Sequence, residues 1–373
     1  MAVVAAPPTG GPAVVSGGGG GSVPPNAFTR ASRQHTEPIL DTIYTPGDTA
    51  QDLGSFEVPP FGFLRDIVVL VEATGAVADT SPPQFQPDAP YSALSLINFH
   101  DVNSQPLYGP INGFNGYLAH KYGGYLFSAD PADAPSYILD AVNGNFSYMF
   151  KIPSEIVARN GLGSLANGNA SSTYRLDLTA AGLGAIYAAN PPATPPTVRI
   201  RAWAEEWTQP FPTDALGRPN EIVPPGLGTT QFWSAQIWNV ASGQNTPRIQ
   251  RVGNYIRNIL MVTRGANGQR TGASFPDPTL VMMDGRMLHN AGRQIFRQWL
   301  AERYGYVATR LDTGVYALDF THDFDGHPGG GDMTDLWLPT TQATRLELQG
   351  VFSAEGTIEF LINDVAASAN SGG

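Results

Sequence analysis

One stretch near the C-terminal end holds the densest group of potential metal ligands in the chain. It contains His322, Asp323, Asp325 and His327, followed by Asp332 and Asp335. Imidazole and carboxylate groups at this density can bind a divalent cation. The glycines at 329–331 are instead typical of an exposed loop. We therefore expect a solvated loop here, with a cation site as the alternative.

The histidines of this stretch also suggest a metal-dependent, cupin-like enzyme. A cupin needs histidines on inward-facing strands, typically with a glutamate between them. His322 and His327 lie five residues apart in a predicted loop, which does not match that arrangement. The cupin hypothesis is therefore an alternative, and metal analysis of the purified protein tests it.

A second group of chemically suggestive residues ends a predicted strand. Glu205 and Glu206 are flanked by Trp203 and Trp207, as in part of a sugar-binding or glycosidase cleft. Glycosidases need two carboxylates that face each other across a gap. Adjacent strand residues point to opposite faces, so this pair cannot act in that way alone. A carbohydrate-binding or carbohydrate-cleaving β-sandwich is an alternative function, and we expect the tryptophans to pack in a core or at a domain interface.

The motifs of several common enzyme classes are missing. The sequence has no Gly-x4-Gly-Lys-Ser/Thr phosphate-binding loop, no His-Glu-x-x-His and no Gly-x-Ser-x-Gly. The glycines at 17–21 have no lysine and helix after them, so they do not form a phosphate-binding loop. We predict no catalytic, cofactor-binding or metal-binding residues, no cofactor and no enzymatic activity.

The charge and composition exclude further classes. The net charge is −11, and only Lys121 and Lys151 are lysines, so we expect no direct nucleic-acid binding. The chain has no cysteine, which excludes disulfides and thiolate metal sites. Its apolar runs are too short to span a bilayer, and residues 1–15 lack the basic start of a secretory signal.

Both ends of the chain predict segments outside the folded domains. Residues 1–35 include Pro7, Pro8, the glycines at 17–21, Pro24 and Pro25. Such a segment cannot bury enough apolar surface to offset its ordering entropy. We expect a flexible N-terminal arm, which either orders against neighbouring subunits or is a dispensable tail. Residues 367–373 predict a C-terminal tail of small residues.

Most of the chain between these ends predicts short β-strands. Segment 63–74 contains a continuous β-branched run typical of a buried strand, and 197–207 alternates with a period of two. The expected strands are 39–44, 55–58, 63–74, 93–102, 145–152, 173–178, 197–207, 232–240, 255–263, 279–283, 315–320, 335–338, 344–352 and 357–362. Helices are expected at 113–122 and at 286–303, where Leu288, Ala291, Ile295 and Trp299 follow a helical spacing.

Turn-forming residues divide this pattern into two domains. The chain has 42 glycines and 32 prolines, and several prolines concentrate at 208–230. We predict a first domain at 36–207, a linker at 208–230 and a second domain at 231–366. The strands do not alternate with helices, which argues against a parallel α/β sheet. The expected fold class is all-β: two tandem eight-stranded jelly-roll β-sandwiches with a short inserted helix in each.

The second half carries a family resemblance. A helix with Ile295, Phe296 and Trp299 leads into strand 314–320, followed by 336–339, 343–348 and 356–361. This order resembles the C-terminal jelly roll of tectivirus-type double jelly-roll major capsid proteins, from membrane-containing icosahedral bacteriophages. The first half is compatible through segments 61–74, 98–101, 113–122, 145–153 and 197–207. The resemblance covers residues 36–364.

The resemblance implies a major capsid protein. Three such chains form a homotrimer with six similar lobes, a pseudo-hexameric capsomer that can tile an icosahedral shell. The implied partners are neighbouring capsomers, vertex and minor capsid proteins and an internal lipid membrane. The implied location is the virion, assembled in the host cytoplasm. Loops 103–110 and 210–228 are candidates to cover exposed sheet edges, which must be protected from uncontrolled strand addition.

Overall fold

The computed structural model describes residues 24–123, 130–321 and 337–366. The stretch from His322 to Asp335 lies outside these residues. Residues 1–23 of the predicted arm and the predicted tail at 367–373 also lie outside them.

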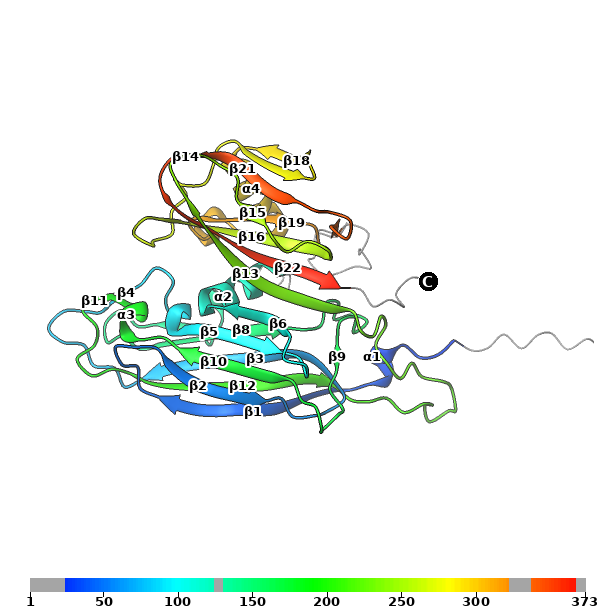
Figure 1. Ribbon diagram of the computed structural model, residues 1–373. Helices are drawn as coiled ribbons and strands as arrows, with labels where there is room; N and C mark the ends of the chain where they lie inside the picture. Colours follow the sequence, from blue (N-terminus) through cyan, green and yellow to red (C-terminus); the bar gives the residue numbers. More distant parts are fainter. Residues whose placement is uncertain (1–23, 124–129, 322–336, 367–373) are drawn as a thin grey trace, which may run out of the picture.

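The first half of the chain forms two antiparallel sheets (Figure 1). One sheet has the order β1-β12-β3-β8-β7, and the other contains β2, β10, β5 and β6. The bounds are β1 Gln34–Tyr44, β2 Gln51–Glu57, β3 Phe63–Thr74, β5 Leu94–His100, β6 Pro106–Ile111, β7 Ile138–Leu139, β8 Phe146–Pro153, β10 Arg175–Ala180 and β12 Thr197–Trp207. Alternate residues of β12, such as Val198, Ile200 and Ala202, are fully buried in the core between the sheets.

The second half repeats this arrangement. One sheet contains β13, β22, β16 and β19, and the other has the order β14-β21-β17-β18. The bounds are β13 Thr230–Val240, β14 Gly243–Asn245, β16 Tyr255–Gly265, β17 Thr279–Met283, β18 Arg286–Ala291, β19 Val315–Asp319, β21 Leu346–Phe352 and β22 Gly356–Ala366. In both halves the eight main strands pair in the same order, and one helix, α2 or α4, follows the fifth of them, β6 or β18. The predicted pair of eight-stranded jelly rolls is confirmed.

Short elements complete the described fold. The strands are β4 Gln84–Phe85, β9 Leu165–Ala166, β11 Tyr187–Ala189, β15 Arg248–Ile249 and β20 Leu338–Pro339. The helices are α1 Phe28–Ala31, α2 Gly113–Tyr122, α3 Leu183–Ile186 and α4 Arg293–Tyr304, with 3-10 turns at Tyr91–Ala93, Pro131–Asp133 and Ala308–Arg310.

The helix predicted at 113–122 is confirmed, but the one predicted at 286–303 is wrong at its start. Arg286–Ala291 is strand β18, and α4 begins only at Arg293. Asp284 and Gly285 have φ angles of 48° and 77° and reverse the chain between β17 and β18. An Asp-Gly pair with both residues at positive φ makes the tight hairpin turn that joins two strands. The apparent helical spacing of Leu288 and Ala291 therefore lies in a hairpin.

The loop predicted at 103–110 is also partly wrong, because β6 begins at Pro106. Pro106 is the first residue of β6, a position where proline is tolerated, and Pro110 lies where the pairing with β5 is irregular. Tyr108 of β6 pairs with Trp233 of β13 in a parallel contact. The first-half sheet that contains β6 and the second-half sheet that contains β13 therefore form one nine-stranded sheet. The edge of the first jelly roll is thus covered by the second jelly roll.

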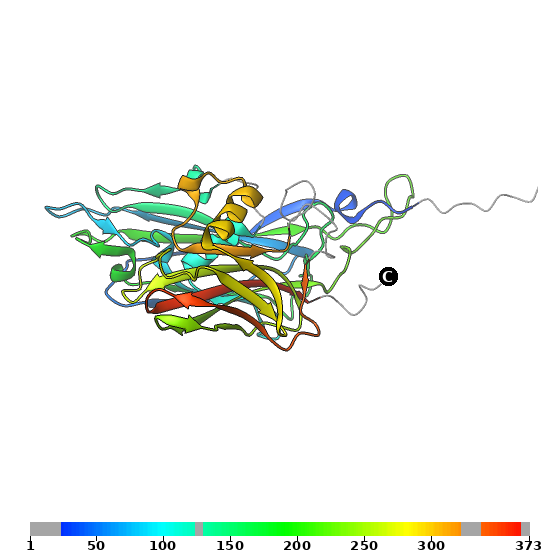
Figure 2. The same ribbon diagram turned by 90° about the horizontal axis from the view of Figure 1, so that it is seen from above.

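The predicted flexible arm is wrong for residues 24–35. Phe28 is 1% exposed, and its ring meets those of Phe63 and Trp207 at centroid distances of 5.3 and 6.2 Å. The Nδ2 group of Asn26 donates to Oδ1 of Asn220 at 2.8 Å. Both views place α1 and the segment between β12 and β13 at the same end of the molecule (Figures 1 and 2). An apolar anchor therefore orders a stretch whose composition alone suggested disorder.

Candidate functional site at the junction of the two jelly rolls

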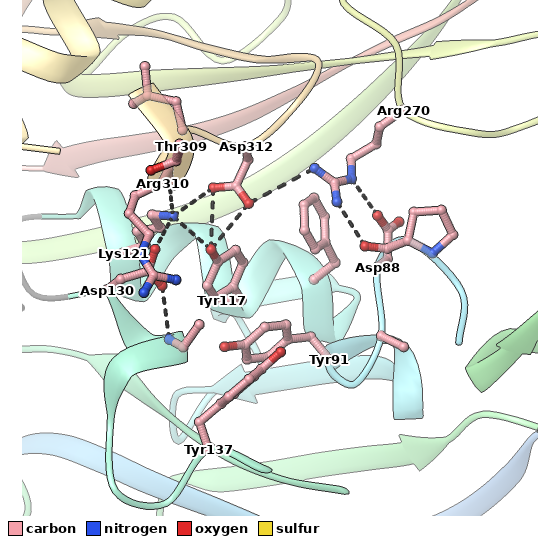
Figure 3. A pocket seen from close by; sticks show the side chains of 15 residues that line it. Asp88, Tyr91, Tyr117, Lys121, Asp130, Tyr137, Arg270, Thr309, Arg310 and Asp312 are labelled. Carbon is pink, nitrogen blue, oxygen red and sulfur yellow. Dashed lines mark hydrogen bonds and ion pairs between the residues drawn. The ribbon is translucent and has the colours of Figure 1, made fainter. Parts of the chain in front are cut away.

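A buried lysine links the two halves of the chain (Figure 3). Lys121 lies near the end of α2 and is 2% exposed. Its Nζ group donates to Oδ2 of Asp130 at 2.8 Å and to Oδ2 of Asp312 at 3.0 Å. It also donates to the carbonyl oxygen of Arg310 at 2.7 Å and to Oη of Tyr117 at 2.9 Å. One carboxylate thus comes from each half, and the buried charge has hydrogen-bonding partners on both sides.

Aromatic rings surround the same ammonium group. Its Nζ atom lies 5.3 Å from the ring centroid of Tyr117, 5.4 Å from that of Tyr122 and 4.9 Å from that of Tyr306. Such distances allow cation–π attraction, which is stronger where water is excluded. Burial and the Asp312 carboxylate raise the pKa of Tyr117 and of Tyr122 well above the usual value. Both hydroxyls therefore stay neutral and can donate to Asp312.

A second ion cluster crosses the junction beside the first. Asp88 of the first half accepts from Nε of Arg270 at 2.6 Å, and its other oxygen lies 2.7 Å from Nη1 of Arg264. Arg270 also donates to the carbonyl oxygen of Pro87 at 2.8 Å and lies over the ring of Phe114. The side chains of Asp88 and Arg270 are only 17% and 11% exposed. The charges of Asp88, Arg264 and Arg270 are therefore paired with one another across the junction of the two halves.

The first turn of α2 carries a third crossing contact. Asn115 is fully buried, and its Nδ2 group donates to Oε1 of Glu359 on β22 at 2.6 Å. Burial raises the pKa of Glu359, and the bond from Asn115 partly offsets that effect. The inserted helix α2 is therefore bonded to the second jelly roll at both ends.

Apolar packing joins the halves as well. The main hydrophobic core of the first half continues into buried side chains of the second half. These are Trp233, Leu260, Val262, Leu300, Tyr304, Tyr306, Val315, Ala317 and Leu361. From the first half, α2 contributes Phe114, Leu118 and Tyr122 to the same core. Since one core spans the junction, the two jelly rolls are held in one fixed orientation.

A small cavity of about 210 Å³ opens at this junction (Figure 3). Three tyrosines line it together with the Lys121 cluster and the Asp88–Arg270 pair: Tyr91, Tyr117 and Tyr137. The cavity has charged groups, but each is already engaged by an opposite charge or a carbonyl group within the chain. This arrangement can fix the two halves together, and it offers no nucleophile paired with a free general base among the described lining residues.

The structure separates the residues considered for carbohydrate chemistry. Glu205 pairs with Nζ of Lys151 at 2.7 Å, whereas Glu206 is fully buried and accepts from Nδ2 of Asn167 at 2.9 Å. Burial raises the pKa of Glu206 to about 7. Trp207 is buried and donates from Nε1 to Oε1 of Glu155 at 2.8 Å. The two glutamates therefore do not face each other across a cleft.

Sequence reasoning missed the residues of the junction. Lys121 was conspicuous only as one of two lysines, and its partner Asp312 is 191 residues away in the chain. No spacing rule connects residues so far apart. The one available signal was the rarity of lysine in a chain otherwise using arginine, which gave no hint of the partner.

Comparisons with known proteins show which fold this chain shares. Neither the protein-family models nor the curated protein sequences contain a match. Solved structures do match. The crystal structure of the STIV MCP (Sulfolobus Turreted Icosahedral Virus) has a TM-score of 0.61 at 13% identity, covering 90% of this chain and 97% of that chain.

Two further solved structures agree with the first. The major capsid protein from bacteriophage PM2 has a TM-score of 0.53 at 10% identity, covering 91% of this chain and 100% of that chain. The Faustovirus major capsid protein has a TM-score of 0.51 at 10% identity, covering 93% and 91%. The chain therefore has the double jelly-roll fold that these capsid proteins share. None of the helices in the described ranges is long and apolar enough to cross a membrane.

Proposed function

We propose that this chain is the major capsid protein of an icosahedral virus, a structural subunit without enzymatic activity. The observation that carries the proposal is the match over nearly the whole length of both chains. The similar capsid proteins are covered to between 91 and 100%, so both jelly rolls and their connection are matched together. Fold alone does not fix function, but these matches all come from capsid proteins.

The junction supports this role. A shell subunit must hold its shape while it meets several neighbours, and the two jelly rolls here share one core and two ion clusters. Three such chains would present six similar lobes, which suits a homotrimeric, pseudo-hexameric capsomer that contacts neighbouring capsomers. We keep the sequence-based boundaries 36–207 and 231–366, with 208–230 as the linker, as part of this proposal, while β1 extends the first jelly roll back to Gln34 and β13 begins at Thr230.

The remaining partners belong to the same proposal. A shell of pseudo-hexamers needs other proteins at its vertices, so we include vertex and minor capsid proteins. An internal lipid membrane and assembly in the host cytoplasm follow from the family resemblance. We propose no direct nucleic-acid binding, because the net charge of −11 opposes contact with phosphates.

The carbohydrate alternative loses its support. It depended on Glu205 and Glu206 as a pair, and these residues lie on opposite faces of β12 with separate partners. The capsid similarities also favour a structural role. The cupin-like alternative rested on His322 and His327, which lie outside the described residues.

Electron microscopy of the source material tests the proposal. We expect icosahedral particles in which peptides of this chain are the most abundant component by mass spectrometry. Purified particles that lack this chain, or that contain it only in traces, would contradict a role as the main building block.

A further inference from the structure

Three potential metal ligands meet at one end of the first jelly roll. His35 and Glu37 lie on the edge strand β1, and Glu206 lies on the neighbouring strand β12. His35 is directly opposite Glu206 in the register, and Glu37 is opposite Ala204. Residues two apart on a strand share a face, so all three side chains project to the same side. One ligand atom of each lies within 4.8 Å of the others, and Nε2 of His35 is 3.7 Å from Oε2 of Glu37.

The buried member of this cluster has an unused oxygen. Glu206 is 0% exposed, and its Oε1 atom accepts the hydrogen bond from Asn167. Its Oε2 atom is buried and has no hydrogen-bond partner among the described residues. Leaving a buried carboxylate oxygen unpaired is costly, and a bound cation would remove that cost.

Two neighbours hold the ligands in place. Asn167 is 3% exposed and donates to the carbonyl oxygen of Pro59 at 2.7 Å as well as to Glu206. The ring of His35 packs on that of Phe61 with centroids 4.4 Å apart. Residues that orient the ligands in this way are typical of metal sites.

We propose that His35, Glu37 and Glu206 form a binding site for a divalent transition-metal ion, with Zn²⁺ the best match. One imidazole and two carboxylates are ligands that Zn²⁺ accepts, in a four-coordinate site with one position left for water. Ca²⁺ takes six to eight oxygen ligands, which this set does not supply. The half-exposed side chains of His35 and Glu37 leave the site open to solvent.

The position of the site indicates what the ion would do. β1 is an edge strand, and β12 is its one partner among the strands that the structure describes. A metal that joins His35 and Glu37 to Glu206 would fasten the first residues of β1 to the interior of the sheet. The proposed metal site does not depend on the capsid role, because all three ligands belong to one folded chain. It also differs from the sequence-based expectation of no metal-binding residues.

Titration of the untagged, chelator-treated full-length protein with Zn²⁺ tests the site. Isothermal titration calorimetry should give a site that His35→Ala and Glu206→Gln each weaken at least tenfold. The control Glu205→Gln changes the adjacent residue on the opposite face and should bind Zn²⁺ like the wild type. A double variant, His322→Ala with His327→Ala, should also keep the site, which separates it from the histidines near the C-terminus.

A spectroscopic readout keeps the test independent of stability. Co²⁺ bound in place of Zn²⁺ should give visible absorption bands that His35→Ala removes, while far-ultraviolet circular dichroism confirms that the variant is folded. The proposal fails if the wild type binds no Zn²⁺. It also fails if folded His35→Ala and Glu206→Gln bind Zn²⁺ as tightly as the wild type.

Discussion

Lys121 in the first jelly roll and Asp312 in the second form an ion pair of 3.0 Å, with side chains only 1% and 14% exposed. The pair is not isolated, since Asp130 lies on the other side of the same ammonium group at 2.8 Å. Removing one member of such a cluster leaves buried charges without compensation. The junction should therefore depend strongly on this single lysine.

Replacing Lys121 with methionine should destabilise the protein by about 3–5 kcal/mol, because the largely buried carboxylates of Asp130 and Asp312 would both lose the ammonium group between them. Equilibrium denaturation with urea measures the change. Arg175→Met is the matched control, since this cation is 51% exposed and pairs with Glu57, which is 62% exposed. We expect a cost below about 1 kcal/mol there. Equal costs for the two variants would show that the junction is not held by Lys121.

Trp233 tests the apolar side of the junction. It is 1% exposed, and its ring packs near Tyr108 of the first jelly roll. Trp233→Ala should cost about 3–5 kcal/mol through lost burial and the cavity left behind. Ile237→Ala on the same strand is the control, because Ile237 is 64% exposed and should change stability little. A small effect of Trp233→Ala would argue against a packed junction.

The shared core predicts that the two jelly rolls unfold together. Differential scanning calorimetry should show one main transition, since side chains of both halves belong to the same hydrophobic cluster. Two well-separated transitions in the wild-type protein would mean that each jelly roll is an independent unit. That result would contradict the rigid subunit inferred from the junction.

His120 predicts a loss of stability in acid. Its ring is buried, neither ring nitrogen has a hydrogen-bond partner within the described part of the chain, and burial lowers its pKa to about 3. An unfolded histidine titrates near 6.5, so the unfolded state binds the additional proton between these values. Stability due to this group is full above pH 6.5 and falls as the pH drops towards 3.

The variant His120→Leu should remove this contribution. From pH 6.5 to 4.5 we expect the free energy of unfolding of the wild type to fall by about 2 kcal/mol more than that of the variant. Urea denaturation at several pH values measures both curves. Parallel curves for the two proteins would show that His120 is not buried in its neutral form.

The sequence predicted the long, regular strands correctly but misassigned two shorter ones. Segments 63–74 and 197–207 match β3 and β12, because a β-branched run and a strict period of two are both typical of strands and not of helices. β6 was taken for part of a loop, and β18 was taken for helix because a short segment can fit either period. The helix error arises where the tight turn at Asp284 and Gly285 overrides the local pattern, and β6 owes its strand to pairing with β5 and β13.

The sites were harder to predict than the strands. The opposite orientations of Glu205 and Glu206 followed from strand geometry alone. The cluster of His35, Glu37 and Glu206 could not be foreseen, since it depends on the register between two strands about 170 residues apart in sequence. The burial of Phe28 was missed for a similar reason, because its partners Phe63 and Trp207 come from distant strands.

Sedimentation of the purified full-length protein tests the central claim most directly. A subunit of a pseudo-hexameric capsomer should sediment as a stable trimer, with about three times the chain mass of 39.7 kDa. The trimer should persist on dilution, as expected for a subunit whose function is assembly. A protein that remains a monomer at high concentration would contradict the proposed role as a capsid building block.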